Sequence, residues 1–166
     1  MHRFLLLFLS LVCLGKASYG QYDLSQFRKY TIANGMSDNI VNSIVQDEDG
    51  FIWIGTMNGL NRFDGRVFEN YFAGNKTGLS GNRIKGLRFF SGKKIGVLSS
   101  KGFSILDTRT LQAQRFTVPD STSLWFSLND ATDAVELPGG QYAFSSIAGF
   151  SVADKDGQLQ YRYDHF

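Results

Sequence analysis

Apolar and polar residues alternate over short runs between residues 40 and 72, and turn-forming sequences separate these runs. An alternation with a period of two indicates β-strands, whereas a wholly apolar run such as Phe51-Ile52-Trp53-Ile54 indicates a strand covered on both faces. Gly50, Gly59 and Gly65 close the three turns between the runs and supply the positive φ that tight turns need. The segment therefore predicts four short strands, at residues 40–46, 51–54, 60–63 and 67–72.

The same order of strands and turns occurs twice more along the chain. The second unit predicts strands at residues 84–90, 95–98, 103–106 and 111–116, and the third at residues 131–137, 142–145, 150–153 and 159–163. No segment after residue 20 keeps a sustained apolar period of 3.6 residues, so we expect little or no helix there.

Three sets of residues recur at the same two steps, 43 residues and then 47. They are an Asn that ends an apolar-Ser-x-Asn pattern, a Gly in the second turn and an Asp in the third turn. The sets are Asn39, Asn82 and Asn129; Gly59, Gly102 and Gly149; and Asp64, Asp107 and Asp154.

A period of this length filled with short strands is typical of β-propeller blades. We therefore predict an all-β fold, a partial β-propeller of about three four-stranded blades. The blades are expected at residues 37–72, 80–116 and 127–163. Three blades do not close a ring, so we interpret the chain as a fragment of a larger propeller.

Residues 1–20 have the pattern of a secretory signal peptide. A short basic start with Arg3 precedes an apolar run over residues 4–14, and Ser18 and Gly20 supply small side chains before a cleavage site at Gln21. The apolar run is too short to span a bilayer comfortably, although an uncleaved anchor is the alternative. The sequence thus predicts an exported protein.

Removing this leader changes the charge and the cysteine content. Arg3 and Lys16 are two of the 17 basic residues, so the mature chain has as many basic as acidic residues, 15 of each. Without a basic excess, nucleic acid is not an expected partner. The single cysteine, Cys13, also lies in the leader, which excludes disulfides and thiolate metal sites from the mature chain.

Residues 21–36 form a lead-in before the first unit, and Phe27-Arg28-Lys29-Tyr30 within it resembles the fourth strand of a blade. A lone strand would leave its backbone groups unpaired. We therefore expect these residues to complete the last blade of the ring, whose other strands would lie beyond Phe166.

Most residues that suggest chemistry have a structural explanation. Asp47-Glu48-Asp49-Gly50 is too short to supply the six to eight oxygens of a calcium site, and a hairpin turn is favoured. Trp53 lies in the most apolar strand, so core packing is favoured over stacking on a sugar. Asp64 and its two counterparts are expected to cap their own turns.

Catalysis has little support, because the mature chain has one histidine, His165, and no phosphate-binding glycine loop. We expect no catalytic residue, no cofactor and no metal. The antiparallel order places the loop before each first strand beside the loop between the second and third strands, and ligands of ring-shaped folds often bind at such an end. The polar residues there are the predicted ligand-binding rim: Ser37, Asp38, Asn39, Asn58, Ser80, Asn82, Arg83, Lys101, Ser127, Asn129 and Asp130.

The first unit resembles the two-component regulator propeller repeat. The resemblance is carried by Ile44-Val-Gln-Asp-Glu-Asp-Gly-Phe-Ile-Trp-Ile-Gly-Thr56 and by Gly59-Leu-Asn-Arg-Phe-Asp64, and Asn34-Gly-Met-Ser37 resembles the usual lead-in. It covers residues 27–72. Gly96 and Ala143 replace the tryptophan in the other two units, so those units are assigned by periodicity alone.

The resemblance implies the amino-terminal, periplasmic sensor part of a Gram-negative two-component regulator. The output of such a protein is commonly a histidine kinase that follows a membrane span, so this fragment would reach the membrane only through later segments. The ligand would be an oligosaccharide or another small molecule, acting on a homodimer of the full-length protein. The alternatives are a secreted propeller enzyme acting on polysaccharide and a passive protein-interaction scaffold.

Overall fold

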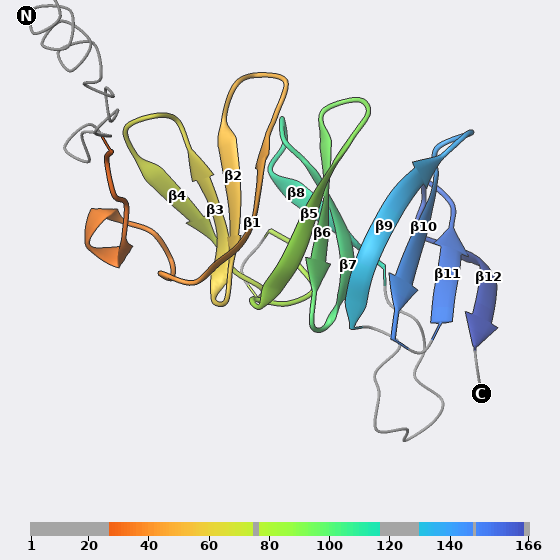
Figure 1. The fold of residues 1–166 in the computed structure, drawn as a ribbon. Helices are drawn as coiled ribbons and strands as arrows, with labels where there is room; N and C mark the ends of the chain where they lie inside the picture. The colour runs from red at the N-terminus through yellow and green to blue at the C-terminus, as the bar shows by residue number, and fades with distance from the viewer. Residues whose placement is uncertain (1–26, 75–76, 117–129, 148, 165–166) are drawn as a thin grey trace, which may run out of the picture.

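Three four-stranded antiparallel sheets stand side by side in chain order in the computed structural model of the protein (Figure 1). The structure describes residues 27–74, 77–116, 130–147 and 149–164, with side chains up to residue 160. The predicted signal peptide, residues 1–20, lies outside the described residues. This arrangement confirms the prediction of an all-β partial propeller, and we call the sheets blades 1, 2 and 3.

Each blade is a meander in which consecutive strands pair. Blade 1 contains β1 (Val41–Gln46), β2 (Ile52–Thr56), β3 (Gly59–Phe63) and β4 (Phe68–Tyr71). Blade 2 contains β5 (Ile84–Phe90), β6 (Lys94–Ser99), β7 (Gly102–Asp107) and β8 (Gln112–Phe116). Blade 3 contains β9 (Ala131–Leu137), β10 (Gln141–Ser146), β11 (Gly149–Ala153) and β12 (Leu159–Asp164).

All twelve strands agree with the predicted ones to within two residues at each end. The differences have local causes. Val67 belongs to the turn before β4, because its N–H donates to Asp64 Oδ1 over 2.7 Å. Leu111 precedes β8, because its φ of 58° lies in the left-handed region, which a strand does not use.

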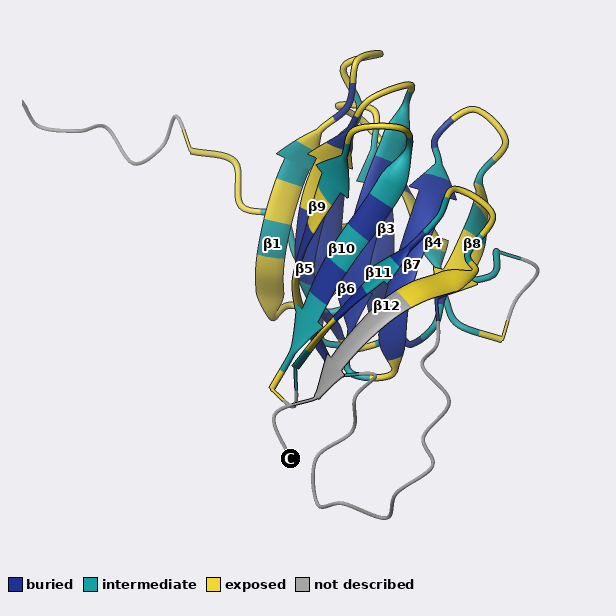
Figure 2. Cartoon of the chain, turned by 90° about the vertical axis from the view of Figure 1, so that its right-hand side faces the viewer, coloured by how far each residue is buried: buried dark blue, intermediate teal, exposed yellow. Residues whose placement is uncertain are grey.

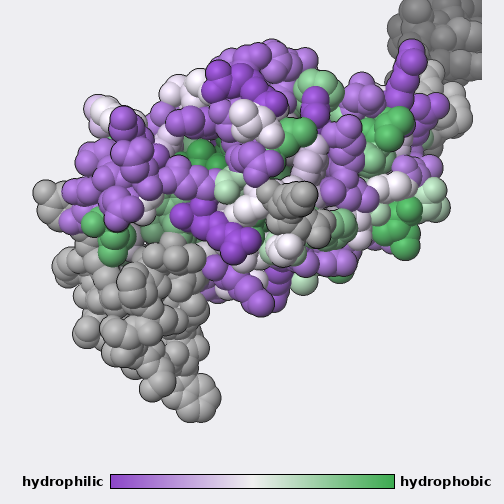
Figure 3. All heavy atoms as spheres, turned by 180° about the vertical axis from the view of Figure 1, so that it is seen from behind, coloured by the Kyte–Doolittle hydropathy of each residue, from purple (hydrophilic) through white to green (hydrophobic). Residues whose placement is uncertain are grey.

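The first strands β1, β5 and β9 lie along one side of the molecule, and the outer strands β4 and β8 lie along the opposite side (Figures 1 and 2). Seen from the outer side, hydrophilic side chains cover most of the surface and hydrophobic ones form small patches (Figure 3). The buried residues lie between the blades and between strands (Figure 2). Each blade is therefore held mainly by the sheet faces that it shares with its neighbours.

Blades 1 and 2 share an apolar core built around Trp53, which has no exposed surface. Leu87, Ile95 and Val97 of blade 2 belong to the same buried cluster. The sheets approach so closely at Gly55 that a Cβ there would lie 2.5 Å from Ile84 Cγ2. Burial of Trp53 confirms its predicted role in core packing, and β2 is covered on both faces as expected.

Asp47 fixes the first turn and the tryptophan together. Its Oδ2 accepts a 2.7 Å hydrogen bond from Trp53 Nε1, and its Oδ1 accepts from the N–H groups of Asp49 and Phe51. Asp47 is itself buried. The Asp-Glu-Asp-Gly segment is thus a hairpin turn, as predicted, and its first carboxylate also satisfies the buried indole.

Blades 2 and 3 share a core that is mostly aromatic. Phe103 stacks on Phe144 with ring centroids 5.3 Å apart, and Phe90 lies 5.3 Å from Tyr142. Gly96 takes the place of the tryptophan, and a Cβ there would lie 2.5 Å from Phe90 Cε2. The second interface therefore fills with phenylalanine rings the space that a tryptophan fills in the first.

Aspartates cap the third turn of every blade, as predicted. Asp64 Oδ1 accepts from the N–H groups of Arg66 and Val67, and Asp154 Oδ1 accepts from those of Asp156 and Gln158. Asp107 Oδ1 accepts equivalent bonds from residues 109 and 110. This shared capping role explains why all three units have the aspartate although only the first has the tryptophan.

The lead-in packs on the face of blade 1 that points away from blade 2. Residues 27–30 form no strand within the described chain, so their pairing with a distant blade stays a prediction. Tyr30 contacts Phe63 and Phe68 edge-on, with centroids 4.9 and 5.5 Å away. The short 3-10 helix η2 (Ile32–Asn34), capped by Thr31, carries the chain onward to Met36.

Substitution of Asp47 by alanine should destabilise the chain much more than substitution of the exposed Asp64. Asp47→Ala leaves a buried indole N–H and two turn N–H groups without their partner, which we expect to cost about 2–4 kcal/mol of unfolding free energy. Asp64→Ala removes two bonds that water can replace, so its cost should be much smaller. Urea denaturation followed by circular dichroism measures both. Equal losses would contradict the role given to Asp47.

Asp107 should make stability depend on pH in acid. Hydrogen bonding to the Arg109 side chain, helped by the backbone N–H groups of residues 109 and 110, lowers the pKa of Asp107 to about 2. A depressed carboxyl pKa stabilises the fold above the unfolded pKa, and this stability is lost as pH falls. The stability difference between the unsubstituted chain and Asp107→Asn should be constant near neutrality and shrink from about pH 4 to about pH 2.

The matched control for this pH dependence is Arg109→Met, which removes the main cause of the lowered pKa. In that background the Asp107→Asn difference should vary much less over the same pH range. An unchanged pH dependence would assign the effect to a group other than this pair.

Candidate functional site

The loops of the predicted rim meet at one end of blade 1 and at the same end of blade 2, as the strand order requires. The Met57 N–H donates to the Ile40 carbonyl over 3.1 Å, and the Ser100 N–H donates to the Arg83 carbonyl over 3.2 Å. The Gly59 N–H also donates to the Asn82 carbonyl over 2.8 Å, which ties the rim of blade 1 to that of blade 2. The rim is therefore continuous over at least two blades.

In blade 1 the rim residues mainly fold the loop. Ser37 Oγ lies 3.0 Å from Thr56 Oγ1, and the Ser37 N–H donates to Asn61 Oδ1. Asp38 accepts from the Ile40 N–H, and Asn39 accepts from the Ile32 N–H. The Asn58 side chain is exposed.

In blade 2 the same pattern leaves two cations exposed. Ser80 Oγ lies 2.7 Å from Ser104 Oγ, and Asn82 Oδ1 accepts a 2.6 Å bond from the Ala73 N–H. The side chains of Arg83 and Lys101 are exposed. These two are the rim residues of blade 2 best placed to meet a ligand.

In blade 3 the described part of the rim is Asp130, because Ser127 and Asn129 lie outside the described residues. Asp130 Oδ1 forms a 2.9 Å ion pair with Lys85 Nζ of blade 2. The rim as a ligand site stays a prediction. The structure places Ser37, Ser80 and Asn82 in hydrogen bonds that shape the loops.

A hollow of about 570 Å³ lies at the far end of the first strands, away from the predicted rim. All three blades contribute to its lining. The lining residues are Glu48 of blade 1; Arg88, Phe89, Phe90 and Ser91 of blade 2; and Ala134, Val135 and Glu136 of blade 3. Phe89 and Val135 are 43% and 54% exposed, so the hollow combines apolar surface with charged groups.

Polar contacts between blades surround this hollow. Arg88 Nε donates to Asp133 Oδ1 over 2.8 Å, and the Ser91 hydroxyl donates to Glu136 Oε1 over 2.7 Å. The Arg88 hydrogen bond lowers the pKa of the Asp133 carboxyl. On the other side of blade 2, Lys93 contacts both carboxylate oxygens of Asp49, which raises the lysine pKa.

Sequence reasoning did not identify this hollow. The signal was the pair Phe89-Phe90, which interrupts the alternation at the end of a first strand. Phe90 is buried against blade 3, and Phe89 remains exposed on the other face of the sheet. Phe89, Arg88 and Glu136 line the same hollow, so its surface offers both an aromatic ring for the apolar part of a ligand and charged groups for polar atoms.

Within the described ranges, no three His, Cys, Asp or Glu side chains gather closely enough to bind a metal ion. In the same part of the chain, no helix has the length and apolar character needed to span a bilayer.

Residues 35–58 match the family model of the two-component regulator propeller. Over 45 residues the chain is 44% identical to histidine kinase P4 of Formosa agariphila. This alignment covers 27% of the chain and 3% of that kinase. The family match contains β1 and β2 of blade 1.

Solved structures resemble a larger part of the chain. The extracellular domain of a putative hybrid two-component system from B. thetaiotaomicron aligns over 82% of this chain with a TM-score of 0.67 and 24% identity. A second such domain from the same organism aligns over 84% with a TM-score of 0.62 and 26% identity. In both cases the chain spans 20% of the solved protein's length.

The matched segment lies in the blade that has the complete Trp-containing pattern, and the wider resemblance extends over the three-sheet arrangement. Residues 35–58 therefore resemble a repeat of the two-component regulator propeller family, and the partial β-propeller that contains them is similar in fold to the extracellular domains of two-component systems.

Proposed function

We propose that this chain is the ligand-sensing part of an extracytoplasmic propeller in a two-component regulator, and that its ligand is an oligosaccharide. The observation that carries the proposal is the match of residues 35–58 to the two-component regulator propeller. Extracellular domains of putative hybrid systems with the same blade arrangement support it. The full-length protein would work at the periplasmic side of a Gram-negative inner membrane, with a histidine kinase output.

The sensing mechanism that we propose is a shift between two arrangements of a membrane-spanning homodimer. A ligand can shift such an equilibrium only if it binds one arrangement more tightly than the other. A ligand that contacts several blades meets this condition when the blades move relative to one another. The hollow around Phe89 is lined by three blades, which makes it suitable for such a ligand.

The chemistry of the hollow favours a saccharide over a purely apolar or purely ionic ligand. Phe89 offers a flat apolar ring, which suits the apolar face of a sugar. Arg88, Glu136 and Ser91 offer donors and acceptors of both charges, which suit hydroxyl groups. The mature chain's equal numbers of acidic and basic residues also disfavour a highly charged polymer as the ligand.

Removal of the Phe89 ring should weaken oligosaccharide binding by the full-length protein. We expect Phe89→Ala to raise Kd about fivefold to tenfold, because a stacked aromatic contributes about 1 kcal/mol or somewhat more. Isothermal titration calorimetry against a panel of neutral oligosaccharides measures this. The matched control is Val67→Ala, an exposed apolar residue that is 60% exposed in an outer turn. Equal Kd values for the two variants would exclude the hollow as the site.

The predicted rim is tested separately with its two exposed cations. If the rim contacts the ligand, Arg83→Ala and Lys101→Ala in the full-length protein should each raise Kd about tenfold or more with little change in Tm. Asn82→Ala is the structural control, because loss of its 2.6 Å bond to Ala73 should lower Tm. Unchanged affinity in both cation variants would remove Arg83 and Lys101 from the site.

These two experiments also separate site from function. If the unsubstituted protein binds an oligosaccharide and neither the Phe89 variant nor the two cation variants lose affinity for it, the sensor proposal stands and its site lies elsewhere. No binding by the unsubstituted full-length protein to any oligosaccharide of the panel would overturn the saccharide proposal itself.

A further inference from the structure

A second hollow lies between blades 2 and 3, beside the third and fourth strands of blade 2. Its volume is about 360 Å³, and small-molecule sites commonly measure about 300–1,000 Å³. Tyr142 of blade 3 closes one side of it. The lining residues are Lys94, Ile105, Asp107, Thr110, Gln112, Ala113, Gln114 and Tyr142. We call this space the outer hollow.

The outer hollow is separate from the hollow around Phe89. Among the described residues, the two hollows share no lining residue. Phe90 lines the hollow around Phe89 and Tyr142 lines the outer hollow, and the centroids of these two rings are 5.3 Å apart. The aromatic core of the interface between blades 2 and 3 therefore divides the two spaces.

Lys94 is the cation of the outer hollow, and the sheet around it does not neutralise its charge. It lies opposite Asp107 on the neighbouring strand, where side chains of opposite charge commonly pair. Asp107 instead accepts from Arg109 Nε and Nη2 over 3.2 and 2.7 Å. Lys94 Nζ contacts the Tyr142 hydroxyl over 3.2 Å. Within the described part of the chain, Lys94 forms no ion pair.

The interface between blades 1 and 2 fills the corresponding place with an ion pair of its own. The hollow left there is only about 50 Å³, and its lining residues are Phe51, Arg62, Asp64, Val67 and Glu69. Arg62 Cζ lies 3.6 Å from the centroid of the Phe51 ring, and Arg62 Nη1 lies 3.3 Å from Glu69 Oε2. A cation and a carboxylate thus occupy this place together.

The two places correspond position by position. The step of 43 residues relates Phe51 to Lys94 and Arg62 to Ile105, and Gln114 lies opposite Ile105 as Glu69 lies opposite Arg62. The second interface therefore has a cation but an amide in place of the carboxylate. The hollow is also larger, because no guanidinium fills it.

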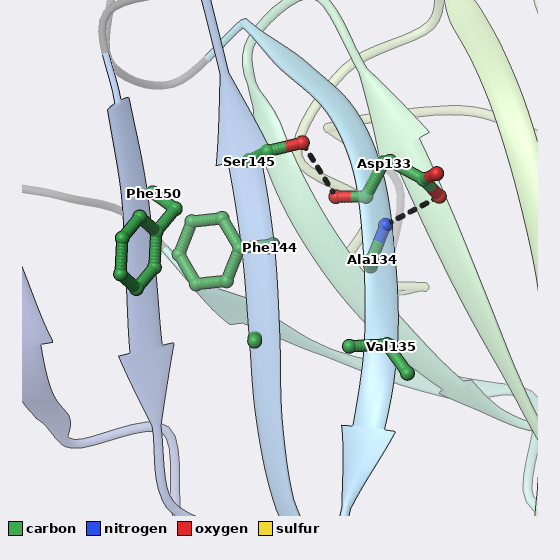
Figure 4. A pocket seen from close by; sticks show the side chains of 7 residues that line it. Asp133, Ala134, Val135, Phe144, Ser145 and Phe150 are labelled. Carbon is green, nitrogen blue, oxygen red and sulfur yellow. Dashed lines mark hydrogen bonds between the residues drawn. The ribbon is translucent and has the colours of Figure 1, made fainter.

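The hollow on the other face of blade 3 differs in chemistry (Figure 4). It measures about 280 Å³, and its lining includes the carboxylate of Asp133 but no basic side chain. The rings of Phe144 and Phe150 lie beside each other there (Figure 4). This hollow offers no charge to attract an anion. The cation, more than the volume, therefore distinguishes the outer hollow.

We propose that the outer hollow binds a small hydroxylated carboxylate. Its carboxylate pairs with Lys94 as Glu69 pairs with Arg62 in the first interface. A bond between an ammonium and a carboxylate is among the stronger hydrogen bonds that proteins make. The proposal does not rest on the oligosaccharide site or on the signalling role.

The remaining lining residues fit the hydroxyl groups of such a ligand. Thr110, Gln112 and Gln114 are exposed at the hollow, and their hydroxyl and amide groups can both donate and accept hydrogen bonds. Tyr142 is 1% exposed, so its ring and hydroxyl form a fixed wall beside the ammonium group. The hollow thus combines one charged contact with several neutral polar ones.

The ligand class is tested by isothermal titration calorimetry of the full-length protein with three probes. D-glucuronate has the carboxylate and the hydroxyl groups, D-glucose lacks the carboxylate, and acetate lacks the hydroxyl groups. We expect glucuronate to bind with a Kd at least about tenfold lower than that of glucose, because glucose cannot pair with the ammonium. Acetate should also bind more weakly than glucuronate. Absence of glucuronate binding, or equal binding of glucose or acetate, would overturn the proposal.

Substitution of Lys94 places the carboxylate. Lys94→Met should raise the Kd for glucuronate about tenfold or more, whereas Lys94→Arg should keep it within about threefold. The matched control is Lys29→Met, which removes an exposed lysine of the lead-in and should leave the Kd unchanged. An unchanged Kd in Lys94→Met would overturn the proposal.

Gln114→Glu tests the same site without removing a group that packs between the blades. The new carboxylate reproduces Glu69 of the first interface and should compete with the ligand for Lys94, raising the Kd about tenfold. Gln114 is exposed, so the Tm should not fall. Gln46→Glu adds the same charge at an exposed position of blade 1 and is the matched control. Equal Kd values for these two glutamate variants would overturn the proposal.

The result is distinguishable from failure of the oligosaccharide proposal. Loss of glucuronate affinity in Phe89→Ala, with affinity retained in Lys94→Met, would place the anion in the hollow around Phe89 and overturn the outer hollow as its site. Failure of every neutral oligosaccharide to bind would overturn only the saccharide proposal, because the glucuronate titrations use a different probe and different variants.

Discussion

A four-stranded sheet with two apolar faces is stable only when both faces are covered, and this constraint organises the molecule. Blade 2 meets it fully, because blade 1 covers Leu87 and blade 3 covers Phe103, and both side chains are nearly or wholly buried. Among the described residues, blade 1 has a neighbouring blade on one face, and the lead-in covers only part of the other. Its Ile44, equivalent to Leu87, is 59% exposed. The same repeat position thus changes from core to surface according to its neighbour, so the unit of stability is the interface between blades.

The two interfaces show that one position can be filled in different ways without changing the fold. In the first, a buried carboxylate and an indole form a pair, since Asp47 accepts from Trp53. In the second, Phe90 and Gly96 stand at the same two positions, and the phenylalanine ring covers the glycine. The second and third units have neither Asp47 nor Trp53 at the equivalent positions, as expected for two residues that depend on each other: a buried Asp without the indole would be an incompletely paired polar group. The tryptophan therefore distinguishes the first unit, but a four-stranded blade forms without it.

The sequence predicted the strands, the turns and the capping aspartates well, because each depends on residues close together in the chain. Alternation locates β1 to β12, and Asp64 caps its turn through bonds to residues two and three positions away. Contacts between blades could not be predicted in the same way. Nothing near Lys93 indicates Asp49, 44 residues away, and nothing near Phe89 shows that it is exposed while Phe90 is buried. The rim was predicted from residue types, but Ser and Asn serve equally well to bind a ligand and to close a loop. The structure shows Ser80 and Asn82 closing loops.

The inner sides of the blades combine firm and adjustable contacts. The apolar clusters lie deep between the sheets, whereas the ion pairs Arg88–Asp133 and Lys93–Asp49 lie at partly exposed positions. Exposed pairs of this kind contribute little to stability, because water and salt screen the two charges. They can therefore exchange partners at low cost while the cores stay closed. A ligand in the hollow around Phe89 would meet Arg88 and Glu136, which already join blade 2 to blade 3. Competition for these groups gives such a ligand a physical means of altering the angle between blades, which a site on a single loop would lack.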